Sequence, residues 1–227
     1  MREVIDALFR HAESSPDRLA VVTEDAQIGY GALARKVIAM AAALSQAPRI
    51  VASMMPRTAD WIATDLALAM LGRTVVPLPE FFSPGQLSHV LADSGAGAVI
   101  ATHETVGRAA SLGWPVLIPH PADGGRRPAR GGSRRIIYTS GTTGCPKGVV
   151  LGECQLSASL TGLAQAVNPS PDDRHLSVLP FSLLLEQVCG LYLPLLSGAA
   201  IFLCPDPQRL PAAAEWWRPT TTVLVPE

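Results

Sequence analysis

Apolar residues along the chain follow two spacings, one typical of strands and one typical of helices. Short apolar runs predict buried strands, and longer segments with apolar residues every three or four positions predict helices. The predicted strands are 19–23, 50–54, 99–100 and 116–118, and the predicted helices are 2–13, 30–45, 58–71 and a short one between the last two strands. Strands that alternate with helices favour an α/β fold of layered, largely parallel sheets flanked by helices.

One further helix has a start that the sequence marks clearly. Ser83 is a favourable cap, Pro84 suits the first helical position, and Gln86 can reach back to the backbone of the cap. We expect this helix to extend to about Ser94.

The most apolar stretch, 176–204, is long enough to suggest a membrane span. However, Pro180, Pro194 and Gly198 interrupt it, and its one charged residue, Glu186, would be costly in lipid. We therefore predict strand, buried helix and strand, with no stable membrane insertion, and keep a shallow membrane contact as an alternative. Glu186 is either a buried structural carboxylate or a group near a ligand site.

The segment 119–134 holds three prolines, four glycines and four arginines. This composition predicts a linker between a first α/β lobe, 1–118, and a second lobe, 135–227. Its arginines, together with Arg135, could attract a polyanion such as CoA or nucleic acid, although a solvated linker explains them better.

Composition narrows the possible functions. The 227 residues are 48% hydrophobic and 16% charged, and the net charge of −1 argues against a nucleic-acid binder. The four cysteines show no C-x-x-C spacing, so we predict no metal site. Because the N-terminus also lacks the apolar core of a signal peptide, a cytoplasmic, reducing setting is expected.

Residues 139–148 are the most informative candidate for a ligand-binding site. Their sequence is Thr-Ser-Gly-Thr-Thr-Gly-Cys-Pro-Lys-Gly. Glycines let the backbone approach a ligand closely, and hydroxyls and a lysine can bind anionic oxygens. Apolar runs on both sides predict a strand, a loop and a strand. The loop fits neither the Walker nor the dinucleotide pattern. It is therefore either a phosphate loop of another kind or a hydroxyl-rich surface loop. The candidate phosphate ligands are Thr139, Ser140, Gly141, Thr142, Thr143, Gly144 and Lys147.

The order Tyr-Thr-Ser-Gly-Thr-Thr-Gly-x-Pro-Lys-Gly at 138–148 closely resembles the phosphate-binding signature of the adenylate-forming superfamily. This superfamily includes acyl-CoA synthetases, luciferases and the adenylation domains of peptide synthetases, and the chain is most similar to fatty-acyl-CoA ligases. The resemblance implies catalytic roles for Lys147 and Thr142. Segments 71–78 and 179–186 also resemble family motifs. The second implies an acyl pocket near Phe181, Ser182, Leu183 and Glu186, with Leu183 where long-chain synthetases often carry a histidine.

The implied reaction has two steps and needs ATP and Mg²⁺, with the Mg²⁺ ligands mainly outside this chain. A carboxylic acid, expected to be fatty or otherwise apolar, attacks the α-phosphate of ATP, and CoA or a phosphopantetheine thiol then displaces AMP. The implied partners are an acyl carrier protein and the missing C-terminal part of the same enzyme.

The later motifs of the family are absent, and Lys36 and Lys147 are the only lysines. The chain thus resembles the N-terminal part of the large domain of an adenylate-forming enzyme, and we expect it to be inactive alone. The alternative is a non-catalytic or degenerate fragment that binds phosphate or a partner.

Overall fold

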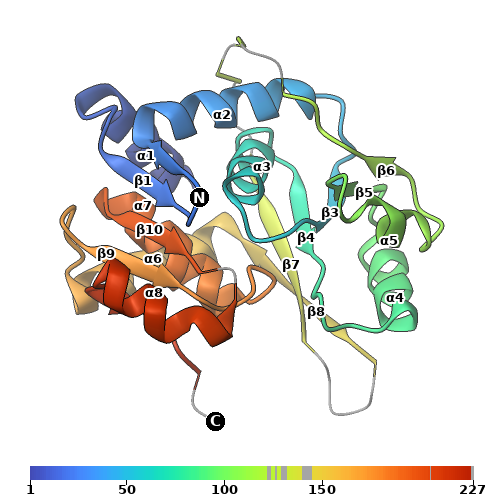
Figure 1. Ribbon diagram of the computed structural model, residues 1–227. Coiled ribbons are helices and arrows are strands. Elements are labelled where there is room, and N and C mark those ends of the chain that lie inside the picture. The colour runs from blue at the N-terminus through green and yellow to red at the C-terminus, as the bar shows by residue number, and fades with distance from the viewer. Residues whose placement is uncertain (122–123, 126, 129–131, 140–144, 205, 226–227) are drawn as a thin grey trace. The chain divides into compact units, whose positions relative to one another are not determined.

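The computed structural model describes residues 1–121, 124–125, 127–128, 132–139, 145–204 and 206–225 (Figure 1). The chain divides into two compact units. The first unit consists of residues 1–35 and 154–227, and the second of residues 36–153. Each unit contains one sheet, so the two are described separately.

The second unit is built on a six-stranded sheet with the order β6-β5-β3-β4-β7-β8. All neighbouring pairs are parallel except β7 and β8, which pair antiparallel. Val76, Leu91, Val99 and Tyr138 belong to the core that packs against this sheet. The strands are β3 (Ile50–Met54), β4 (Thr74–Pro77), β5 (Ala98–Ala101), β6 (Val116–Leu117), β7 (Arg134–Thr139) and β8 (Lys147–Gly152), and the helices are α3 (Ala59–Met70), α4 (Pro84–Ser94) and α5 (Val106–Ala110).

The first unit is built on a five-stranded sheet with the order β11-β9-β10-β1-β2, in which only β2 is antiparallel to its neighbour. Its strands are β1 (Leu19–Val22), β2 (Gln27–Gly29), β9 (Arg174–Ser177), β10 (Ala200–Leu203) and β11 (Thr221–Thr222). Its helices are α1 (Arg2–Ser14), α6 (Glu153–Val167), a π-helix (Glu186–Tyr192), α7 (Leu193–Ser197), a 3₁₀-helix (Pro207–Arg209) and α8 (Leu210–Trp217); α2 (Tyr30–Ala43) contains the boundary at residue 35.

The predicted fold class is confirmed, since both sheets are mostly parallel and flanked by helices. Helix α4 also begins as predicted. The side chain of Ser83 accepts a hydrogen bond from the backbone N–H of Gln86 at 3.3 Å. The side chain of Gln86 in turn accepts one from the backbone N–H of Ser83 at 2.9 Å. The helix ends at Ser94, before Gly95 with φ of 67°. Only a residue that tolerates positive φ suits that position.

The apolar stretch 176–204 forms a strand, a helix and a strand, as predicted. The helix is wound as a π-helix before it continues as α7, a feature that apolar periodicity did not indicate. Among the described residues, none of the helices has both the length and the apolar character needed to cross a membrane.

The segment 119–134 connects β6 to β7, two strands of the same sheet. Strand β7 begins at Arg134, one residue earlier than expected. The observed units interleave along the chain and differ from the predicted lobes 1–118 and 135–227. The division into lobes 1–118 and 135–227 remains a prediction.

Candidate functional site

Strands β7 and β8 form an antiparallel pair that we call the phosphate hairpin, residues 134–152. Thr139 at the end of β7 lies opposite Lys147 at the start of β8. The two strands of the predicted strand, loop and strand are therefore present. The predicted ligands Ser140, Gly141, Thr142, Thr143 and Gly144 lie outside the described residues.

Thr139 and Lys147 are both exposed, at the end of the phosphate hairpin where the chain passes from β7 to β8. No acidic side chain in the described part of the chain pairs with the ammonium group of Lys147. Lys36, the other lysine, forms an ion pair with Asp60. Of the two lysines, Lys147 is thus the one whose charge is available to an anionic ligand.

Tyr138 fixes the phosphate hairpin to helix α4. Its hydroxyl group donates to a carboxylate oxygen of Asp93 at 2.6 Å. Burial raises the pKa of Tyr138, and the bond to Asp93 raises it further, so the hydroxyl group stays protonated as the donor. On β8, a Cβ atom at Gly148 would lie 2.9 Å from the Tyr138 ring. Glycine there leaves room for the ring to lie across the strand.

His89 makes a second contact from α4 to the phosphate hairpin. Its Nε2 lies 3.1 Å from the carbonyl oxygen of Pro146, immediately before Lys147. His89 and Asp93 are four residues apart and so lie on one face of the helix. Sequence reasoning missed both residues. Their spacing was a visible signal, but their partners lie 57 and 45 residues away along the chain.

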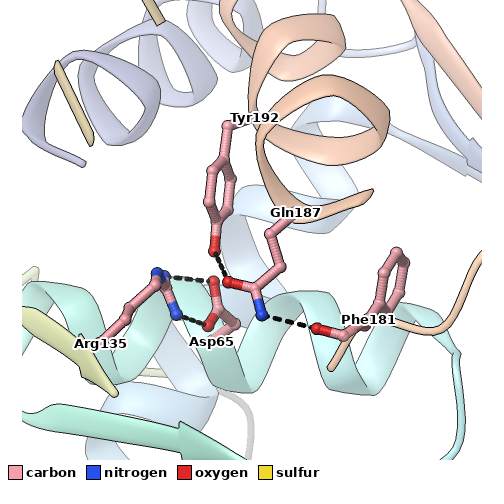
Figure 2. A network of polar contacts seen from close by, with 5 residues as sticks. All are labelled: Asp65, Arg135, Phe181, Gln187 and Tyr192. Carbon is pink, nitrogen blue, oxygen red and sulfur yellow. Dashed lines mark hydrogen bonds and ion pairs between the residues drawn. The ribbon is translucent and has the colours of Figure 1, made fainter. Parts of the chain in front are cut away.

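A buried ion pair holds the start of β7. The guanidinium group of Arg135 donates to both carboxylate oxygens of Asp65 on α3, at 2.8 Å for the longer bond (Figure 2). Both side chains are 2% exposed. Arg135 therefore does not belong to an exposed, polyanion-attracting cluster. The sequence interpretation was wrong for this residue because its partner lies 70 residues away.

The predicted acyl-pocket residues lie in the first unit, at and before the π-helix. Phe181, Ser182 and Glu186 are buried and Leu183 is half-buried. Glu186 accepts a 2.5 Å hydrogen bond from the hydroxyl group of Ser177 on β9. This contact agrees with the structural alternative for Glu186.

Glycine makes room for this carboxylate inside the π-helix. A Cβ atom at Gly190 would lie 2.7 Å from the carboxyl group of Glu186. The next residue, Gln187, is bonded at both ends of its amide. Its Nε2 donates to the Phe181 carbonyl oxygen at 2.6 Å, and its Oε1 accepts from the Tyr192 hydroxyl group at 3.3 Å (Figure 2).

Ser182 differs from these neighbours. Its hydroxyl oxygen is buried and has no hydrogen-bond partner among the described residues. A buried hydroxyl group without a partner is unfavourable, so the hydroxyl group of Ser182 is a polar atom of the predicted pocket that a ligand could bind. The role of all four residues in an acyl pocket stays a prediction.

Across the same described residues, no three His, Cys, Asp or Glu side chains are grouped so that they could hold a metal ion. The chemistry that the site offers is therefore the binding of anionic oxygens at the phosphate hairpin, through a free lysine and hydroxyl groups.

Comparison with known proteins agrees with this geometry. The family model described as AMP-binding enzyme matches residues 8–124 and 126–227. The chain is 29% identical to a dimodular nonribosomal peptide synthase from Bacillus subtilis (strain 168) over 230 residues, which cover 90% of this chain and 10% of that protein. It is 31% identical to the mitochondrial malonate–CoA ligase of Homo sapiens over 182 residues, 70% of this chain and 31% of the ligase.

A solved structure shows the same fold. The N-terminal subdomain of NpsA from Klebsiella oxytoca, in complex with 3-hydroxybenzoyl-AMSN, superimposes with a TM-score of 0.82 at 26% identity. The match covers 97% of this chain and 59% of the NpsA chain. The chain thus spans well under two thirds of the length of each of these proteins.

Proposed function

Because the chain belongs to the AMP-binding enzyme family, we propose that this protein activates a carboxylic acid with ATP. The acid forms an acyl-adenylate and releases pyrophosphate, and a thiol then displaces AMP. The observation that carries the proposal is the phosphate hairpin, where Lys147 and Thr139 are exposed and Lys147 has no acidic partner in the described part of the chain.

The hairpin acts by stabilising the negative charge of the phosphate groups. Lys147 and the hydroxyl groups of Thr139 and Thr142 neutralise the β- and γ-phosphates of ATP and the pyrophosphate as it leaves, which is electrostatic stabilisation by preorganised donors. Helix α4 keeps the hairpin in place through His89 and Asp93. ATP supplies the leaving group. The described residues offer no ligand set for Mg²⁺, so no step is assigned to that ion.

The substrate is a fatty or other apolar acid, and its acceptor is CoA or the phosphopantetheine of an acyl carrier protein. The apolar sequence of the segment 176–204 supports an apolar acid, and the unpartnered hydroxyl group of Ser182 supports one polar contact to it. Glu186 lies in the same segment, with Ser177 as its donor. A cytoplasmic setting, and action together with a further part of the same enzyme, belong to this proposal.

The test combines pyrophosphate binding with pyrophosphate release by the purified chain. Release is measured with ATP, Mg²⁺ and a panel of short, medium and long fatty acids and aromatic acids. Lys147→Ala should abolish pyrophosphate binding, and wherever release is measurable it should fall about 10²-fold, as when one charge-stabilising group is lost. The matched control is Lys36→Ala, which removes the other lysine and should leave both signals unchanged.

The outcomes separate the proposal from its alternative. Acid-dependent release that Lys147→Ala removes would show that the chain adenylates acids by itself. Pyrophosphate binding or release that is unchanged in Lys147→Ala would remove the hairpin from the mechanism. Binding that depends on Lys147 without release under any condition favours the second candidate, a phosphate-binding module without turnover.

A further inference from the structure

Helix α4 contacts the phosphate hairpin at both of its strands. Asp93 accepts from the Tyr138 hydroxyl group on β7, and the ring of His89 contacts Pro146, the residue immediately before β8. The two helix residues are four positions apart and so lie on one face. One face of α4 therefore contacts the chain on both sides of the segment 140–144, which contains most of the candidate phosphate ligands.

The hydrogen bond of His89 has a defined direction. Its Nε2 lies 3.1 Å from the carbonyl oxygen of Pro146. A carbonyl oxygen can only accept a hydrogen bond, so Nε2 carries a proton and donates it. Any uncharged side chain with an N–H group at the same position can replace it, which makes the bond testable by substitution.

Pro146 is a rigid point between exposed residues. It is buried, whereas its neighbours Cys145 and Lys147 are exposed. The proline ring fixes φ at about −65°. The bond from His89 orients the carbonyl group of the next peptide unit, which joins Pro146 to Lys147. The backbone of Lys147 is therefore fixed at two points, by this peptide unit and by its pairing with Thr139.

The side chain of Lys147 lies on the face of the hairpin that is turned away from α4. Tyr138 directs its side chain to α4, and Thr139 points to the other face, because side chains alternate along a strand. Lys147 is paired with Thr139, and residues paired across two strands share a face. Helix α4 thus fixes the hairpin from one face and leaves the ammonium group of Lys147 available on the other.

We propose that His89 is a positioning residue for Lys147: by donating to the Pro146 carbonyl oxygen, it keeps the lysine where the phosphates of ATP bind. The inference rests on the proposed function, because it takes Lys147 as the phosphate ligand. His89 is itself exposed, so its bond competes with water and contributes little to stability. Its effect should therefore appear in phosphate binding rather than in unfolding.

Pyrophosphate binding by the purified chain tests the proposal, with denaturant unfolding measured for each variant. His89→Ala removes the donor, so Lys147 occupies the binding position for a smaller fraction of the time, and the apparent affinity falls with that fraction. The loss should be up to about fivefold, the factor that a net hydrogen bond of ordinary strength gives. The midpoint of unfolding should stay nearly unchanged.

Two further variants separate position from charge. His89→Gln carries an uncharged amide whose N–H can donate to the same carbonyl oxygen, so it should restore the affinity. An effect that came from charge on the imidazole ring would not be restored. His103→Ala removes another exposed histidine of the same unit and should bind pyrophosphate as the unchanged chain does.

NMR of the ¹³C,¹⁵N-labelled chain without ligand gives a second measurement. The carbonyl carbon resonance of Pro146 should shift in His89→Ala, because its hydrogen bond is lost, and should return towards its original position in His89→Gln. A resonance that is the same in His89→Ala as in the unchanged chain would show that the bond is absent in solution, and would overturn the proposal.

The binding results distinguish this inference from the function on which it rests. Affinity in His89→Ala equal to that of the unchanged chain, with binding lost in Lys147→Ala, would overturn the role of His89 and leave the proposed function intact. Equal weakening in His89→Ala and His89→Gln would show that the donor is not what positions the lysine. An unchanged chain that binds no pyrophosphate, or binding that survives in Lys147→Ala, would contradict the proposed function and this inference together.

Discussion

Two polar residues of the phosphate hairpin are exposed, whereas two in the segment around the π-helix are buried. In the hairpin, Thr139 and Lys147 are exposed, and Lys147 has no acidic partner in the described part of the chain. In the other segment, Glu186 and Gln187 are fully buried and hydrogen-bonded to other groups of the same unit. The more apolar segment therefore binds these two polar side chains within the protein, while the hydroxyl group of Ser182 in the same segment has no hydrogen-bond partner among the described residues.

This difference separates two uses of a polar side chain. A buried polar group must be bonded inside the protein, since leaving it without a partner costs free energy. An exposed group carries no such cost and is available to bind a ligand. Partner contacts in the folded state, rather than residue type, therefore indicate which polar residues stabilise this protein and which are available for function.

The largest effect on stability is expected where both members of a pair are charged and buried. Asp65→Ala would leave the buried guanidinium group of Arg135 without its carboxylate and should lower the free energy of unfolding by about 3–5 kcal/mol. The control is Asp60→Ala on the same helix, which breaks a partly exposed pair with Lys36 and should cost less than about 1 kcal/mol. Denaturant unfolding measures both, and similar losses would contradict the comparison.

His175 tests the comparison at a buried polar residue with one of its two ring nitrogens bonded. Burial lowers the pKa of His175 to about 4 in the folded state, against an ordinary value of 6.5, so the unfolded chain binds one more proton between these pH values. The contribution of His175 to stability is therefore present above pH 6.5 and is lost as the pH falls towards 4, by about 3 kcal/mol in total.

Unfolding curves at pH 7 and pH 5 measure this loss. Carboxyl groups also titrate in this range, so the quantity of interest is the difference between the unchanged chain and His175→Phe. That variant should show a weaker dependence on pH between 7 and 5. An identical dependence in both proteins would mean that His175 does not stay neutral in the folded state.

A smaller effect is expected from two serines that each donate to a glutamate. Ser177→Ala removes the hydroxyl group that bonds the buried Glu186 and should cost about 1–3 kcal/mol. Ser157→Ala removes the exposed bond to Glu3 and should change the free energy of unfolding by less than about 0.5 kcal/mol. Comparable costs at both sites would show that burial does not set the value of these bonds.

Local signals explain what the sequence could predict. The capping box of α4 involves residues three apart, and the hairpin strands flank a contiguous motif, so both were visible in the chain. The Asp65–Arg135 pair and the Tyr138–Asp93 bond join residues 70 and 45 positions apart. No propensity or spacing rule specifies such pairs. The π-helix was also missed, because the apolar periodicity gave no sign of it.

The smallest change in stability is expected at Lys147, the residue with the largest expected effect on function. Lys147→Ala removes an exposed side chain with no acidic partner in the described residues, so the free energy of unfolding should change by less than about 0.5 kcal/mol. The adjacent Gly148→Ala is the matched control on the same strand. Its new Cβ atom would lie 2.9 Å from the buried Tyr138 ring and should cost about 1–3 kcal/mol. If Lys147→Ala instead unfolds as easily as Gly148→Ala, the lysine supports the hairpin itself, and its loss of phosphate binding could no longer be assigned to direct contact.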